Sequence, residues 1–215
     1  MKVPAFITAL IASLLLICAP AMANVGAAPA PHALVQDVTD RLLDDIARYR
    51  KALAGAASES EKNAMMGRFF DELSATLEPV VDFHWIALNV MGKHRAAATA
   101  EQQARFREAF TRGLVETYGR GLLNYSDQKI VVLPPREPLD GQRKVTVVQE
   151  IQGADAKYPL LYSMGQNRKG EWKVVNVIIN GINLGTTFRN QFAQAFARHN
   201  GDIDKVITTW TTTET

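Results

Sequence analysis

The sequence predicts an α+β fold, in which a mainly helical first half packs with a four-stranded antiparallel sheet and an apolar cavity lies between them. Three observations support this prediction. Apolar residues recur at helical spacing up to about Asn124, and short segments rich in Val, Ile and Tyr follow, separated by turn-forming residues. The last of these segments is apolar on both faces, which is unusual for an antiparallel strand.

The chain begins with the pattern of an export signal. Lys2 precedes an apolar run that ends at Cys18, and Ala21-Met22-Ala23 is a small-x-small cleavage pattern. We therefore expect a signal peptide at 1–23 and a flexible linker at 24–33. The apolar run is shorter than the roughly 20 residues that span a bilayer, which disfavours an N-terminal anchor. Ile17 before Cys18 is too bulky for a lipoprotein signal, and cleavage removes the only cysteine.

The helical half is expected over 34–125. The first two helices carry apolar stripes at Leu34, Val38, Leu42, Ile46, Tyr49 and Leu53, and then at Met65, Phe69, Leu73 and Leu77. Pro79 is expected in the first turn of a third helix that ends at Gly92. Thr99-Ala-Glu-Gln102 is a capping-box pattern, and it introduces the most regular helix, with Phe106, Phe110, Leu114, Tyr118 and Leu122 on one face.

The second half, 126–210, is expected to form an antiparallel meander followed by two helices. The four predicted strands are Lys129–Leu133, Arg143–Ile151, Tyr158–Met164 and Glu171–Ile179. One helix runs through Phe188, Phe192 and Phe196, and Asp202 caps a shorter one that ends near Trp210. Residues 211–215 are expected to be a loose tail.

The cavity prediction depends on the last two strands. Trp172, Val174 and Ile178 alternate with Val175, Val177 and Ile179, so both faces of this strand need cover. Helices can cover both faces, and apolar residues at strand spacing are more often solid core than pocket wall. Periodicity does not distinguish a filled core from a lined pocket, so a protein-interaction module with a solid core stays open at this point.

The residues that carry catalysis in common motifs are missing or poorly placed. The histidines at 32, 84, 94 and 199 lack the spacing of a helical zinc site, and Ser126-Asp-Gln-Lys129 matches S-x-x-K without its companion motifs. Asp82 and His84 are the best candidates for an acid–base pair, but residues two apart on a helix do not face each other. We therefore expect Asp82 to be a structural hydrogen-bond acceptor, and we expect no catalytic residue, metal or cofactor. A net charge of only +2 argues against nucleic acid as a partner.

From Pro79 to Ile207 the chain carries a series of short patterns in a characteristic order. The helical part supplies Val81-Asp82-Phe83, Ile86-Ala87, Val90-Met91-Gly92, Thr99, Gln102, Phe106, Phe110, Leu114 and Tyr118. The sheet and the C-terminal part supply Trp172-Lys173-Val174, Asn176-Val177, Gly181-Ile182-Asn183-Leu184, Phe192 and Gly201-Asp-Ile-Asp204. Together these patterns resemble the MlaC family of periplasmic phospholipid carriers, also labelled toluene-tolerance auxiliary proteins. Asn176, Asn180 and His94-Arg95 depart from the residues usual in that family.

The resemblance implies an NTF2-like sheet, a periplasmic location and a bound phospholipid as cargo. It implies exchange with an inner-membrane ABC transporter complex that includes an MCE-domain protein, and with an outer-membrane lipoprotein–porin complex. Such a carrier would maintain the lipid asymmetry of the outer membrane, and we expect a monomer without enzymatic activity. Two alternatives remain: an NTF2-like enzyme that uses Asp82 and His84 on a small apolar substrate, and a carrier of another lipid such as a hopanoid.

The wall of the predicted pocket combines helical and strand residues whose stripes face the expected cavity. We predict that lipid contacts Ile86, Val90, Phe106, Phe110, Leu114, Val147, Ile151, Leu160, Tyr162, Met164, Val174 and Ile178.

Overall fold

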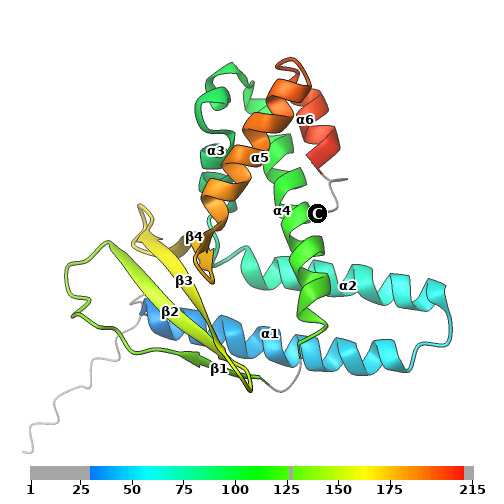
Figure 1. The fold of residues 1–215 in the computed structure, drawn as a ribbon, viewed down its shortest axis with the longest axis vertical. Helices are drawn as coiled ribbons and strands as arrows, with labels where there is room; N and C mark the ends of the chain where they lie inside the picture. Colours follow the sequence, from blue (N-terminus) through cyan, green and yellow to red (C-terminus); the bar gives the residue numbers. More distant parts are fainter. Residues whose placement is uncertain (1–29, 126–127, 211–215) are drawn as a thin grey trace, which may run out of the picture.

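The computed structural model describes residues 30–125 and 128–210. It consists of a helical hairpin at the base, a curved sheet beside it, and a group of four helices at the opposite end of the molecule (Figure 1). The predicted signal peptide, the start of the linker, Ser126 and the tail lie outside the described residues. None of the helices in the described ranges combines the length and the apolar character that crossing a bilayer requires.

The first two helices form an antiparallel hairpin at the base of the molecule. Helix α1 (Pro31–Ala54) begins at a proline, three residues before the predicted start, and ends at Gly55. Helix α2 (Glu59–Leu77) begins earlier than its apolar stripe indicates. The side chain of Ser58 accepts a hydrogen bond from the backbone N–H of Glu61 at 3.2 Å, so this S-x-x-E pattern caps the helix.

The next helices stand across this hairpin (Figure 1). Helix α3 (Phe83–Met91) is capped by the carboxylate of Asp82, which accepts from the Trp85 N–H at 2.9 Å. The prediction that Pro79 occupies its first turn is wrong, because the backbone after Leu77 forms turns before the helix starts. The short 3₁₀ helix η1 (Gly92–Ala97) leads to α4 (Ala100–Leu122), and the predicted capping box of Thr99 and Gln102 is present.

The sheet is a meander in the order β1-β2-β3-β4-β5, with every neighbouring pair antiparallel. Its predicted strands are observed as β1 (Lys129–Val132), β2 (Lys144–Gln152), β3 (Lys157–Gln166) and β4 (Trp172–Ile179). A fifth strand, β5 (Ile182–Asn183), was not predicted. Asn180 and Gly181 connect it to β4 with φ values of 48° and 83°, the positive φ that a two-residue hairpin loop requires.

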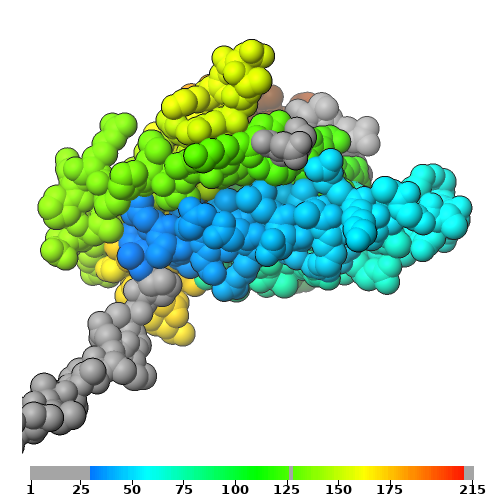
Figure 2. All heavy atoms as spheres, turned by 90° about the horizontal axis from the view of Figure 1, so that it is seen from below, coloured from blue at the N-terminus to red at the C-terminus, as the bar shows by residue number. Residues whose placement is uncertain are grey.

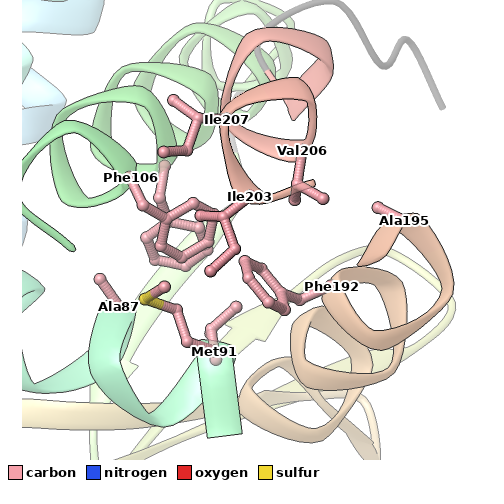
Figure 3. Close-up of a cluster of buried hydrophobic side chains, with 10 residues drawn as sticks. Ala87, Met91, Phe106, Phe192, Ala195, Ile203, Val206 and Ile207 are labelled. Carbon is pink, nitrogen blue, oxygen red and sulfur yellow. The ribbon is translucent and has the colours of Figure 1, made fainter. Parts of the chain in front are cut away.

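Two helices complete the chain. Helix α5 (Leu184–Arg198) starts directly after β5 and is capped by the side chain of Asn183. Helix α6 (Ile203–Trp210) is capped as predicted by Asp202, which accepts from the Lys205 N–H at 3.0 Å. Together with α3 and α4 these helices enclose a solid apolar cluster (Figure 3), consisting of Ala87, Val90, Met91, Phe106, Phe110, Phe192, Ala195, Ile203, Val206 and Ile207. We call this set the filled cluster.

Candidate functional site

A cavity of about 250 Å³ lies between α1, α4 and the sheet, and α3 and the start of α5 close its remaining sides. Its wall is almost wholly apolar. Helix α1 contributes Leu34, Val35, Val38, Thr39 and Leu42, the α2–α3 region contributes Leu73, Leu77, Val80, Val81, Phe83 and Ile86, and α4 contributes Phe110, Leu114, Val115, Tyr118 and Leu122. The sheet and α5 contribute Tyr162, Met164, Val174, Asn176, Val177, Leu184, Gly185 and Phe188.

Helix α1 forms a thin outer wall of the cavity. Its apolar stripe faces inward, while Gln36, Asp37 and Asp40 on its other side are exposed. Figure 2 shows α1 in blue running along the underside of the molecule between the sheet and α2. A single helix therefore separates this side of the cavity from solvent.

A β-bulge decides which residues of β4 face the cavity. Met164 of β3 pairs with Val174, whereas the preceding Ser163 pairs with Asn176, so Val175 is the extra residue. Beyond the bulge, Val177 pairs with Tyr162 and shares its face. The bulge thus turns Val177 toward the cavity and shifts the alternation that a regular strand would have.

Three polar side chains form a hydrogen-bonded chain beside the cavity. The hydroxyl of Tyr162 donates to Gln149 Oε1 at 2.8 Å, and Gln149 Nε2 donates to Thr39 Oγ1 at 2.7 Å. Thr39 in turn donates to the backbone carbonyl of Val35 at 2.8 Å. Gln149 is only 3% exposed, and burial raises the pKa of Tyr162 to about 12. This series of hydrogen bonds fastens α1 to β2 and β3, and it gives each of these buried polar groups a partner.

The cavity reaches the surface beside α4. Tyr118 lines the cavity and is nevertheless 42% exposed.

At the junction of β4 and α5, Asn176 Oδ1 accepts a hydrogen bond from the Gly185 N–H at 3.1 Å. A Cβ atom at position 185 would lie 2.7 Å from Asn176 Oδ1, so this close approach requires glycine.

The comparisons with known proteins agree with this architecture. The family model described as MlaC protein matches residues 48–212. The chain belongs to the MlaC family. This confirms the family predicted from the short sequence patterns.

Two curated proteins and one solved structure are similar to this MlaC-family chain. The toluene tolerance protein ttg2D of Pseudomonas putida is 40% identical over 185 residues, covering 86% of this chain and 81% of that protein. The intermembrane phospholipid transport system binding protein MlaC of Haemophilus influenzae is 27% identical over 156 residues, covering 72% and 69%. The structure of a phospholipid-binding protein from Ralstonia solanacearum, in complex with a phospholipid, matches with a TM-score of 0.70. It is 24% identical, covers 85% of this chain and 95% of its own, and confirms the fold.

Six of the twelve residues predicted for the pocket wall of this MlaC-family chain lie on the cavity. They are Ile86, Phe110, Leu114, Tyr162, Met164 and Val174. Helix α4 therefore presents the predicted stripe to the cavity over its middle turns, and β3 and the first part of β4 present the predicted face.

The other six lie away from the cavity wall, for three reasons. Val90 and Phe106 face the filled cluster, because α3 and α4 continue past the end of the cavity. Val147 is fully buried in a cluster that also contains the cavity-lining residues Val35 and Val174, and its side chain does not reach the open space. Ile151 and Leu160 each lie two residues closer to the β2–β3 turn than Gln149 and Tyr162, beyond the edge of the cavity. Ile178 pairs with Leu161, which lies on the opposite face of the sheet.

Sequence reasoning missed two features of the site. The α1 stripe of Leu34, Val38 and Leu42 was identified as a helix face, but nothing in its spacing separates a cavity wall from core. Gln149 was also missed, although it interrupts the apolar face of β2 between Val147 and Ile151. A polar residue at such an inward position is the signal that indicates a buried hydrogen-bonded chain.

The acid–base alternative places Asp82 and His84 beside an apolar cavity, but in the structure the two residues border open surface clefts outside that cavity. Asp82 is used as the cap of α3, and His84 is exposed and does not border the apolar cavity. Within 30–125 and 128–210, no group of three or more His, Cys, Asp or Glu side chains is arranged to hold a metal ion.

Proposed function

We propose that this chain carries a phospholipid across the periplasm, between an inner-membrane ABC transporter complex with an MCE-domain protein and an outer-membrane lipoprotein–porin complex. In this role it maintains the lipid asymmetry of the outer membrane. The observation that carries the proposal is the apolar cavity, which reaches the surface at Tyr118. The names of the Haemophilus and Ralstonia relatives, which refer to phospholipid transport and phospholipid binding, support it.

The energetics of hydrocarbon transfer explain what such a cavity must do. Each methylene exposed to water costs about 0.8 kcal/mol, so two tails with on the order of 30 methylenes cost about 24 kcal/mol. A dry wall of aliphatic and aromatic side chains removes most of this cost. Lipid tails in a bilayer are already out of water, so exchange between bilayer and carrier can be nearly balanced in free energy, and it requires no bond breaking by the carrier.

The size of the cavity limits which lipid it can hold in this conformation. A volume of about 250 Å³ is just below the range of pockets that enclose drug-sized ligands, roughly 300–1,000 Å³. We expect the cavity to widen when a lipid with two tails enters. The thin α1 wall, attached to the sheet through the polar chain of Thr39, Gln149 and Tyr162, is the wall we expect to move.

Lipid extraction and native mass spectrometry of mildly purified protein test the proposal. We expect a co-purified phospholipid, and uptake of labelled phospholipid from vesicles by protein that has been stripped of lipid. Leu114→Trp places an indole in the cavity and should reduce uptake strongly. Thr117→Trp, on the exposed side of the same helix, is the matched control and should bind normally. Protein that is lipid-free after mild purification and takes up no lipid would falsify the proposal.

A further inference from the structure

The net charge of +2 hides an uneven distribution. Residues 83–100 and 184–201, which form α3, η1 and α5, contain four lysines or arginines and no aspartate or glutamate. These cations are Lys93, Arg95, Arg189 and Arg198, and all four are exposed. By contrast, α1 and α2 carry eight carboxylates and six lysines or arginines.

The two segments form one continuous surface, because α3 packs side by side with α5 (Figure 1) and η1 continues directly from α3. Arg189 Nε donates to the carbonyl of Asn89 at 2.9 Å, and Asn89 Nδ2 donates to the carbonyl of Trp85 at 2.7 Å. Further along, the ring of His94 lies 4.1 Å from that of Phe196, which fixes η1 on α5. Trp85 is 46% exposed at one end of this surface. We call Trp85, Lys93, Arg95, Arg189 and Arg198 the cationic face.

The carboxylates that border this face are already used. Asp82 caps α3, and Asp202 caps α6 and lies 3.5 Å from the ammonium group of Lys205. Asp204 accepts from Arg105 at 2.6 Å and from Gln102 at 2.9 Å. Among the described residues, no ion pair joins a cation of this face to a carboxylate. Its positive charge is therefore directed outward.

We propose that the cationic face docks the protein on the surface of an anionic phospholipid bilayer. The charges are spread over two helices without a binding pocket, which suits a diffuse anionic surface. Exposed tryptophan next to cations is typical of groups that lie at the headgroup level of a membrane. Each cation near an anionic surface raises affinity roughly fivefold, so three of them contribute about a hundredfold at low salt.

Docking by this face would also bring the cavity close to the membrane. Ile86 of α3 and Leu184 and Phe188 of α5 line the cavity, so the helices that carry the cationic face also form part of its wall. The purpose of docking rests on the proposed function, but vesicle binding itself does not. The two are separable, because cavity-blocked Leu114→Trp protein should still bind vesicles.

Vesicle co-sedimentation tests the docking surface. We expect the full mature protein to bind phosphatidylglycerol-containing vesicles at low salt, to lose binding at high salt, and to bind pure phosphatidylcholine vesicles weakly. The triple variant Lys93→Gln/Arg95→Gln/Arg198→Gln should lose about a hundredfold in affinity. The control Arg41→Gln/Lys51→Gln/Lys62→Gln changes the net charge equally on α1 and α2 and should stay within about twofold of wild type.

A second variant tests whether the cationic face contributes to vesicle binding by more than its charge. Trp85→Ala leaves every charge in place and should weaken binding to anionic vesicles without changing the melting temperature. Equal losses in the two triple variants would show a net-charge effect and overturn the proposal. Binding to an acidic protein without binding to anionic vesicles would overturn it as well, because the occupant would then be a protein.

Discussion

The two apolar regions of this molecule are both built from hydrophobic side chains, yet one is solid and the other is hollow. In the filled cluster, the rings of Phe106 and Phe192 meet edge to face at 4.9 Å, and Trp210 lies 5.3 Å from Phe106. Four helices surround these rings and leave Phe106 with no exposed surface. Around the cavity, the facing residues of α1, α4 and the sheet are mainly Leu and Val, and they leave about 250 Å³ open.

Phe110 marks the boundary, since it belongs to the filled cluster and also lines the cavity. On one side of it, helices pack on helices with aromatic side chains between them. On the other, α4 faces a sheet whose strand β4 carries the bulge at Val175, and the side chains between them leave open space. The comparison shows that hydrophobicity, which the two regions share, does not by itself distinguish a filled region from a hollow one.

The largest expected difference between the regions concerns truncation of an aromatic side chain. Phe106→Ala should lower the free energy of unfolding by about 3–5 kcal/mol, because it opens a new void in a solid cluster. Phe188→Ala, on the cavity wall, should cost less than about 3 kcal/mol, because one side of this ring already faces empty space. Urea denaturation of lipid-free protein measures both values. Equal costs would mean that Phe188 is packed on all sides and that the hollow is not empty.

Much of the structure of these two regions could be predicted from the sequence. The helices of the first half and the strands that build the cavity follow from apolar spacing, and the capping box before α4 follows from Thr99 and Gln102. The two-residue strand β5 could have been found, because Asn180-Gly181 is a strong hairpin signal. The bulge at Val175 could not, since no residue type requires it, and one extra residue reversed the inward assignment of Val177 and Ile178. The sequence also gave no means to locate the point at which the stripe of α4 passes from cavity to core, between Phe110 and Phe106.

A second prediction concerns substitutions that add side-chain volume to each region. We expect them to affect the stability of the lipid-free protein differently. Val90→Phe places a ring in the filled cluster and should destabilise the protein by about 1–3 kcal/mol through overpacking. Val38→Phe directs the same ring into the cavity, so the stability of lipid-free protein should be unchanged or higher, while lipid uptake should fall. Both substitutions lie on helices, and a chemical-denaturation curve together with a vesicle-uptake assay reports both effects. A large loss of stability in Val38→Phe would show that the cavity has no room for a ring.

The smallest expected effect concerns the polar chain that spans one side of the hollow region. Tyr162→Phe removes the donor to Gln149 and should cost about 1 kcal/mol at neutral pH, the net value of one hydrogen bond. The buried phenol makes a sharper test, because its pKa in the folded state is about 12, above the usual value of 10 for the unfolded chain. Below about pH 10 both states keep the proton, and the stabilisation is fully present.

Between about pH 10 and 12 the unfolded chain loses this proton first, so unfolding becomes more favourable as pH rises. Wild type should therefore lose stability over this window more steeply than Tyr162→Phe, which lacks the group. Other tyrosines and the lysines titrate in both proteins, and the difference between the two curves cancels them. Parallel curves would show that Tyr162 is exposed to water in solution, and the wall formed by α1 and the sheet would then be open even without lipid.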